Sequence, residues 1–570
     1  MESGRTGRCD VLIVGAGPTG LTLALALLRY GLVVRVVDAL PGPTPWSKAQ
    51  VLHTRTLEVL EQLSAIDGFL LRGRALHLVS MYAQDLRRIV HFTVGEFDST
   101  YPYMLSLPQR DTEEILIEYL HRAGLTVERS CQFLSLQQSD GGVTVELLRG
   151  DTAEREQVHA AWVVGCDGAH SAVRGAIGVT FEESGPPLRV LQADVRIDWP
   201  LAYAEDEVVG FVSEHGHIGA FPLPSPQRYR LMVFDDGLAP TLENFQFLLQ
   251  TRGPVGARLS EPHWLNENTV HRGQASRFRV GRVFLAGDAA HAHSPATGQG
   301  MNAGMQDAFN LAWKLAMVQR GVGRDVLLDS YEAERVPVAA ELLRTTDLAT
   351  RGLNDLFTIY GAVGQGVRNT LLHFVGELGL VRRSVSRNLS MLDVSYRDSP
   401  IVGQHHGSRA EQAGRGDAIG LRDWIDFGHG PTPGQRAVDG RVVDVGRHEH
   451  TRLFTLLHGG RHVLLLFAGA QESEPGYGRL VEIGHRVREW LGDSVDVYLV
   501  QIDPTTAAAT YPLPTPWDGA RLHDEHGTLH QAYGARAECV YLIRPDGHIG
   551  YRCQPADVSR VREYIERIWI

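Results

Sequence analysis

Residues 15–20 (GAGPTG) have the types and spacing that suit a bound diphosphate. They follow the apolar run Cys9–Val14 and precede an apolar stretch over 21–30. A glycine-rich turn that opens a helix presents backbone N–H groups and the positive end of the helix dipole to an anion. In such a turn Gly15 makes the tight bend, Gly17 lets a pyrophosphate approach the backbone, and Gly20 lets the helix pack on the strand.

An acidic residue at the end of the next strand completes this pattern. Val33 to Val37 is β-branched and apolar, and Asp38 follows it, 18 residues after Gly20. A carboxylate at this place suits a ribose hydroxyl. The order strand, turn, helix, strand and acid therefore predicts a Rossmann-like dinucleotide site, although it does not by itself distinguish FAD from NAD.

A second stretch with chemistry-bearing residues runs from Phe284 to Arg320. It begins as a buried strand, reaches Gly287 and Asp288, and passes through a loop that contains Pro295. Apolar residues spaced by three and four then predict a helix that ends at Gly321. The glycines of the loop suit a negative charge held by backbone N–H groups, whereas the carboxylate of Asp288 suits a ligand hydroxyl.

Together these stretches resemble the FAD motifs of flavin-dependent aromatic monooxygenases of class A, of the phenol hydroxylase and pentachlorophenol hydroxylase type. The resemblance implies that Asp288 holds the ribitol hydroxyls, Pro295 lies near the reacting flavin edge, and the amides of 298–302 face the pyrimidine ring. Residues 162–174 resemble the family's GxDGxxSxVR motif, which implies contact with FAD and with the nicotinamide donor. The predicted cofactor-binding residues are Gly15, Gly17, Pro18, Thr19, Gly20, Asp38, Lys48, Gln109, Asp167, Arg174, Gly287, Asp288, Pro295, Gly298, Gly300, Met301 and Asn302.

The sequence departs from the family pattern at the expected catalytic base. Yeast-type phenol hydroxylases carry an Asp in the segment that here contains Gln50, which cannot accept a proton. His53 lies three residues further on and is our candidate base, because an unperturbed imidazole has a pKa of about 6.5. Pro295, His217 and Tyr229 are the other candidate catalytic residues. The alternative for His53 is a packed or solvated histidine without a catalytic role. The alternative for His217 and Tyr229 is that they are ordinary residues of a sheet.

Composition narrows the class of protein. The chain has 570 residues, 43% hydrophobic and 21% charged, and a net charge of −12, which argues against a nucleic-acid partner. Five scattered cysteines form neither a disulfide framework nor a metal-ligand cluster, so no metal is expected. The start lacks a signal-peptide pattern, and glycines interrupt the apolar stretch 11–28, so we expect no membrane span and a cytoplasmic protein.

The predicted fold class is α/β with three domains, and the resemblance implies their roles. The FAD-binding domain is expected over 1–75, 103–188 and 275–395, with an inserted β-sheet substrate domain over 76–102 and 189–274. Gly, His, Asp and Pro are frequent over 396–436, which predicts a linker. Residues 437–570 resemble the thioredoxin-like domain of the phenol hydroxylase group, but they lack CxxC, so a structural role or a part in a homodimer is expected.

The resemblance implies a reaction of FAD with NADPH or NADH, O₂ and an aromatic or aromatic-polyketide substrate. The donor reduces the flavin, O₂ adds at flavin C4a, and the hydroperoxide transfers one oxygen atom to an electron-rich carbon. Baeyer–Villiger or epoxidising oxygenation uses the same chemistry and stays open, as does a flavin-binding protein without turnover.

Overall fold

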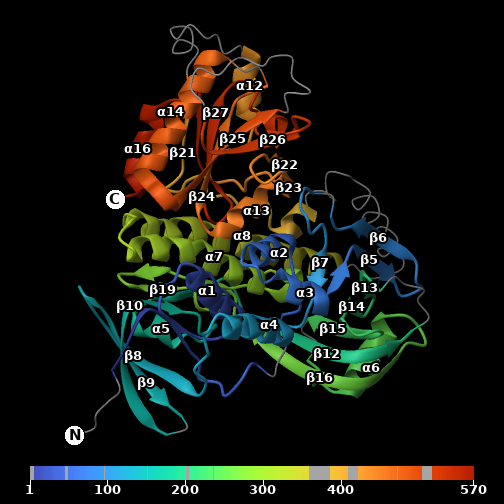
Figure 1. Cartoon of the computed structure of the whole chain (residues 1–570). Coiled ribbons are helices and arrows are strands. Elements are labelled where there is room, and N and C mark those ends of the chain that lie inside the picture. Colours follow the sequence, from blue (N-terminus) through green and yellow to red (C-terminus); the bar gives the residue numbers. More distant parts are fainter. Residues whose placement is uncertain are drawn as a thin grey trace. The chain divides into compact units, whose positions relative to one another are not determined.

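The chain divides into two compact units, which are described separately (Figure 1). The first comprises Met1–Ala312 and Arg335–Leu392, and the second comprises Trp313–Glu334 and Asp393–Ile570. The computed structural model describes residues 6–44, 49–95, 97–150, 152–199, 205–234, 237–357, 386–407, 421–470, 473–502 and 517–570.

The central sheet of the first unit is built around β1 (Thr6–Val14). This strand is parallel to β2 (Val34–Val37) on one side and to β10 (Glu154–Gly165) on the other. β10 in turn pairs in parallel with β19 (Val283–Leu285). Leu12 and Ile13 have no exposed surface, as expected for a strand that is covered on both faces. The carboxyl ends of these four parallel strands therefore meet at one edge of the sheet.

Antiparallel strands and helices complete this sheet. β9 (Gly142–Arg149) pairs with β10 and with β8 (Cys131–Ser139), and β18 (Arg279–Val280) pairs with β19. α1 (Pro18–Arg29) connects β1 to β2 and packs against α4 (Gln109–Arg122). The shorter helices of this part are α2 (Thr54–Gln62), α3 (Ile66–Arg72) and α5 (Ala172–Ala176).

A second seven-stranded sheet brings together two distant parts of the sequence. Its strand order is β16-β12-β15-β14-β13-β5-β6. The bounds are β5 (Leu78–Ala83), β6 (Arg88–Thr93), β12 (Leu188–Asp198), β13 (Glu207–Ser213), β14 (Gly216–Pro222), β15 (Arg228–Phe234) and β16 (Arg258–Val270). α6 (Leu242–Arg252) covers one face, where Phe245 and Leu249 join an apolar core with alternate residues of the strands.

Short elements connect the two sheets to the long helices. One small sheet contains β3 (Val51–Leu52), β7 (Met104–Ser106) and β4 (Arg74–Leu76), and another contains β11 (Phe181–Glu183), β17 (Gly273–Ala275) and β20 (His291–Ala292). After β19 come the 3₁₀ turns η1 (Gly287–Ala289) and η2 (Pro295–Thr297), then α7 (Gly300–Gln319) and α8 (Val326–Phe357).

The second unit contains an eight-stranded sheet with the order β21-β28-β27-β24-β25-β26-β22-β23. Its strands are β21 (Gly403–His406), β22 (Arg441–Asp444), β23 (Glu449–Arg452), β24 (His462–Phe467), β25 (Val495–Ile502), β26 (Ala520–Asp524), β27 (Cys539–Ile543) and β28 (Ile549–Gln554). Its helices are α12 (Leu421–His429), α13 (Leu453–Leu456), α14 (Glu474–Leu491), α15 (Thr528–Ala532) and α16 (Val558–Ile568), with the 3₁₀ turns η3 (Leu457–Gly459) and η4 (Gly492–Ser494).

The described part of the predicted linker over 396–436 contains a strand and a helix that belong to the second unit. β21 pairs in parallel with β28, and Phe427 of α12 is fully buried in the core of the second unit. The Gly- and His-rich composition concealed these elements because Gly403–His406 is a short edge strand without an apolar pattern.

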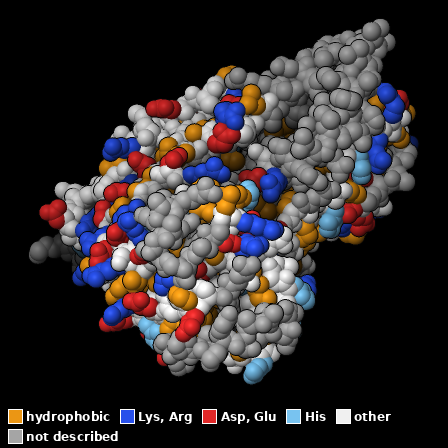
Figure 2. Space-filling model, turned by 90° about the horizontal axis from the view of Figure 1, so that it is seen from above, with side chains coloured by type: hydrophobic (Ala, Val, Ile, Leu, Met, Phe, Trp, Pro, Cys, Tyr) orange, Lys and Arg blue, Asp and Glu red, His pale blue; other side chains and the backbone are white. Residues whose placement is uncertain are grey.

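No helix of the described residues has the character of a membrane span, and their visible surface does not carry a single sign of charge. No helix among them is long and apolar enough to cross a membrane. On the face shown in Figure 2, acidic and basic side chains are interspersed.

Candidate functional site

The three glycines of the first turn have different surroundings. Gly15 has φ +106°, and a Cβ atom there would lie 2.3 Å from the Cys166 carbonyl oxygen. A Cβ atom on Gly20 would lie 2.0 Å from the Gly15 carbonyl oxygen, so helix α1 packs directly on the turn. A Cβ atom on Gly17 would meet no described atom within 4 Å, which leaves open space beside the backbone for a ligand.

The N-terminus of α1 is suited to an anion. Gly17 is its N-cap, Pro18 begins the helix, and the first turn carries neither a side-chain cap nor an acidic residue among the described residues. Asp38 lies beside this turn, where its Oδ2 accepts a hydrogen bond of 2.6 Å from the Ala16 N–H. Backbone donors and a carboxylate thus lie next to each other, as a phosphate and a ribose require.

The second glycine motif packs against the first through Thr19. Gly287 has φ +62°, and a Cβ atom there would lie 2.5 Å from Thr19 Oγ1. A Cβ atom on Gly304 in α7 would lie 2.3 Å from the same oxygen. Asp288 is exposed between buried Gly287 and Ala289, so its side chain projects from the packed turn.

Asp307 binds the same turn from α7. Its Oδ2 accepts hydrogen bonds from the Gly287 N–H at 3.0 Å and from His291 Nε2 at 2.6 Å, and its Oδ1 accepts one of 2.5 Å from Arg335 Nε. Burial alone would raise the pKa of Asp307, but the charges of His291 and Arg335 lower it to about 2. This carboxylate was not identified as a site residue from the sequence. A single acidic residue among the apolar positions of the predicted helix could have indicated that it has a buried partner.

Asn302 fixes the loop that precedes α7. Its Oδ1 accepts from the His53 N–H at 2.8 Å, and its Nδ2 donates to the carbonyls of Val51 and Gly298, both at 2.8 Å. Gly298 is left-handed, with φ +66°, and Pro295, Gly298, Gly300 and Met301 are half-buried. The Asn302 side chain therefore positions the loop, in which the Gly298 N–H donates to the Pro295 carbonyl at 3.1 Å.

His53 is not poised as the sequence predicted. Its side chain is buried, and Nε2 donates a hydrogen bond of 3.0 Å to the Thr297 carbonyl. Burial lowers the pKa of His53 to about 4, so the ring is neutral near neutral pH and a weaker base than an imidazole of ordinary pKa. Nδ1 is buried and has no hydrogen-bond partner among the described residues.

Gln50 joins the small β3-β7-β4 sheet to the second seven-stranded sheet. Its Nε2 donates to Ser106 Oγ at 2.9 Å and to the Pro222 carbonyl at 3.1 Å, and the Ser106 hydroxyl donates to the same carbonyl at 2.6 Å. Gln109 lies alongside, because its Oε1 accepts from the Ala49 N–H at 3.3 Å. The second sheet is thus anchored to the strand that leads to His53.

Tyr229 lies on the wrong face of the second sheet for its predicted role as a base. It is buried in the core beneath α6, with its ring 5.0 Å from that of Trp199. Arg230, the next residue, points to the opposite face, forms a buried two-bond pair with Asp194 at 2.7 Å and donates to the Ala49 carbonyl. His217 alternates with the core residue Ile218 and so also lies on that opposite face; burial lowers its pKa to about 4.

Asp167 and Arg174 stabilise turns through hydrogen bonds to neighbouring residues. Asp167 accepts hydrogen bonds from the Ser171 hydroxyl at 2.5 Å and from the Val173 N–H at 3.1 Å. Arg174 donates to the carbonyls of Ala169 at 2.8 Å and Ala289 at 2.9 Å. Arg174 therefore holds the turn that contains Asp288. Lys48 lies outside the described residues.

Comparison with known proteins agrees with this geometry. Residues 8–346 match the family described as "FAD binding domain". The 6-methylpretetramide 4-monooxygenase of Streptomyces rimosus is 34% identical and covers 98% of this chain and 93% of its own; pentachlorophenol 4-monooxygenase of Sphingobium chlorophenolicum is 32% identical, with coverages of 88% and 93%. The solved anhydrotetracycline hydroxylase from Streptomyces rimosus is 28% identical, with a TM-score of 0.71 over 99% of both chains.

The chain belongs to this FAD-binding family. The resemblance predicted from the two glycine motifs is confirmed, and the protein is an FAD-dependent monooxygenase with a mixed α/β fold. The open side of Gly17, the α1 N-terminus without a side-chain cap among the described residues, and exposed Asp288 fit the diphosphate and hydroxyl groups of FAD.

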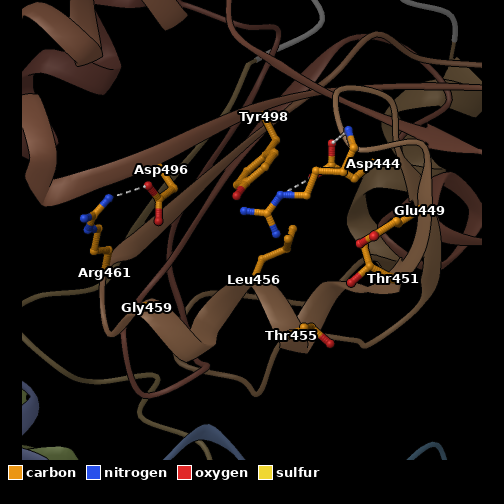
Figure 3. Close-up of a pocket in the computed structure, with 10 residues that line it drawn as sticks. Asp444, Glu449, Thr451, Thr455, Leu456, Gly459, Arg461, Asp496 and Tyr498 are labelled. Atoms are coloured by element: carbon orange, nitrogen blue, oxygen red, sulfur yellow. Dashed lines mark hydrogen bonds and ion pairs between the residues drawn. The ribbon is translucent and has the colours of Figure 1, made fainter.

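A pocket in the second unit has a different character (Figure 3). It has a volume of about 350 Å³ and is lined by charged and polar side chains, including Asp444, Arg447, Arg461, Asp496 and Tyr498. Arg461 pairs with Asp496 at 3.1 Å and Arg447 with Asp444 at 3.8 Å. Because its charges are largely paired within the wall and none of the predicted cofactor residues lines it, this pocket is not a candidate for the flavin.

Proposed function

We propose that the protein hydroxylates an aromatic or aromatic-polyketide substrate with FAD, O₂ and NADPH or NADH. The observation that carries this proposal is the direct packing of the two glycine motifs through Thr19. Asn302 of the second motif is hydrogen-bonded to the 49–53 segment, which anchors the second sheet. The relatives are named for a pretetramide, for pentachlorophenol and for anhydrotetracycline, which supports this class of substrate.

The residues that would hold FAD follow from the contacts. The amides around Gly17 would bind the diphosphate, Asp38 a ribose and Asp288 the ribitol hydroxyls. The amides of 299–302 and the positive end of α7 would stabilise negative charge on the reduced ring. Bound FAD supplies the redox chemistry, taking two electrons from the nicotinamide and activating O₂. A C–H group, O₂, NAD(P)H and one H⁺ give C–OH, NAD(P)⁺ and H₂O.

The second sheet, over 76–102 and 189–274, is our proposed cover for the substrate. Its face opposite α6 carries Phe221 and Arg230, and Gln50 and Ala49 bind that side of the sheet. A cover of this kind excludes water, which favours oxygen transfer over release of hydrogen peroxide. Neutral His53 would serve this site by holding the Thr297 carbonyl in place, with Nδ1 as an acceptor.

The C-terminal domain, 437–570, is proposed to be thioredoxin-like and redox-silent. β24 and β25 are parallel with α14 between them, and the antiparallel pair β27–β28 follows and leads to α16, which is the order of that fold. Cys539 and Cys553 are both buried, neither forms a disulfide, and they lack a CxxC spacing. A structural role or a part in a homodimer is the proposed purpose of this domain.

Steady-state consumption of NADPH, NADH and O₂ against a panel of phenols and fused-ring phenols tests the function. We expect substrate-stimulated oxidation of the donor and one ¹⁸O atom from ¹⁸O₂ in the product by mass spectrometry. Product without the label, or donor oxidation that no aromatic compound stimulates, would overturn the proposal. A ring-expanded ester instead of a phenol would assign Baeyer–Villiger chemistry.

A further inference from the structure

Asp307 contacts residues 287–302, the segment along which we propose that FAD binds, at two points. One is the Gly287 N–H, 3.0 Å from Oδ2, at the start of the turn that projects Asp288. The other is His291 Nε2, 2.6 Å from the same oxygen, four residues further along. The residues between these points form the loop from which Asp288 is exposed, so one carboxylate closes that loop from within.

The contact with His291 extends toward Pro295. An ionised carboxylate only accepts hydrogen bonds, so His291 carries its hydrogen on Nε2. His291 Nδ1 lies 2.8 Å from Nε2 of His293, which is two residues before Pro295. Asp307, His291 and His293 are all buried, and water therefore does not replace these hydrogen bonds. The chain of contacts ties the turn at 287 to the loop at 295.

Arg335 explains why a carboxylate can stay ionised in this position. Its Nε binds Asp307 Oδ1 at 2.5 Å, and its Nη2 donates to the Ala303 carbonyl at 3.2 Å. Arg335 of α8 thereby contacts α7 at both Asp307 and Ala303. Both ions are almost completely buried, so removal of one leaves the other charge without its partner.

We propose that Asp307 is a positioning residue for FAD, which acts by clamping residues 287–293 through Gly287 and His291. The proposal rests on the proposed position of FAD along 287–302. It predicts that loss of Asp307 weakens FAD binding more than an equal loss of fold stability elsewhere in the protein does. No contact between Asp307 and the cofactor is needed, because the carboxylate acts on the backbone that presents Asp288.

The experiment compares Asp307→Asn with Glu334→Gln. Glu334 also forms a buried ion pair between α7 and α8, with Lys314 at 2.7 Å, and it binds Arg544 as well. Both variants break a buried pair, so both should lower the melting temperature. We expect Asp307→Asn to weaken FAD binding by roughly 10–100-fold, the range found when outer hydrogen-bond partners of metal ligands are removed, and Glu334→Gln to bind FAD like the parent. Equal FAD affinities of the two variants, measured by fluorescence titration of folded apoprotein, would overturn the proposal.

A second pair of variants covers the case in which Asp307→Asn does not fold. His291→Gln places an amide N–H where Nε2–H lies and should retain the parent's FAD affinity, whereas His291→Leu should lose it. Equal affinities of these two variants would refute the clamp. Asp288→Ala is measured in parallel: if it retains FAD while His291→Leu loses it, the proposed place of the ribitol fails but the clamp does not.

Discussion

Replacing Gly17 by alanine adds one methyl group on the open side of the first glycine turn. Gly17 has φ −78° and ψ −179°, which alanine adopts without strain, and its Cβ would meet no described atom within 4 Å. The folded protein should therefore tolerate the change. A glycine replaced by alanine at a compatible site stabilises a fold by about 0.4–1 kcal/mol, because the unfolded chain loses freedom.

The substitution should instead weaken the binding of FAD. If the methyl group keeps the diphosphate from the N–H groups at the start of α1, one charge-assisted hydrogen bond is lost, at about 1.5–3 kcal/mol. At 1.4 kcal/mol for each factor of ten, this corresponds to about 10- to 150-fold weaker FAD binding. The melting temperature of the apoprotein should stay the same or rise slightly.

Two glycine variants serve as controls in equilibrium dialysis and thermal unfolding. Gly20→Ala places a Cβ 2.0 Å from the Gly15 carbonyl oxygen and should destabilise the apoprotein, by about 1–3 kcal/mol as overpacking does. Gly141→Ala, in the turn between β8 and β9, also adds a methyl group into open space; it should leave FAD affinity unchanged and the melting temperature the same or slightly higher. If Gly17→Ala binds FAD as tightly as Gly141→Ala does, the diphosphate does not lie against this turn.

Three further predictions concern other parts of the site. Asp288→Ala should weaken FAD binding by about tenfold or more without lowering apoprotein stability, since its side chain is exposed; full FAD retention after dialysis would contradict this. His53 has a folded pKa of about 4, below its ordinary 6.5, so the unfolded state binds more protons and stability is lost as the pH falls from 6.5 to 4. His53→Gln should flatten that slope in urea titrations, and an unchanged slope would show that His53 titrates normally. Cys539→Ser and Cys553→Ser should turn over like the parent, and loss of activity in a folded variant would contradict a redox-silent domain.

The backbone features of the site could be predicted from the sequence, because they are local. Gly15, Gly17 and Gly20 act through their missing side chains, and the structure gives each the space or the close contact that its place in the turn requires. The turn at Gly287 and Asp288 could be predicted for the same reason. The parallel strands then bring Asp38 and Gly287 to the same edge of the central sheet as Gly15.

The side-chain features depended on distant partners and were not predictable. The low pKa of His53 follows from its burial against residues near 297, and the sequence gives no sign of that burial. Tyr229 is a candidate catalytic residue in the sequence because the register of β15 is not evident there, and a shift of one residue exchanges its face with that of Arg230. Asp307 acquires its importance only when Gly287 and His291 fold back onto α7.

The contact of Thr19 with Gly287 and Gly304 also bears on how the protein is made. A chain leaves the ribosome from its N-terminus, and domains generally fold as they emerge. Here the first βαβ unit emerges early, but its packing partners in the second motif are absent until residue 304 has been added, and the Asp307–Arg335 pair until residue 335. The cofactor site is therefore a late product of synthesis, and nascent chains that stop before this helix should emerge without flavin.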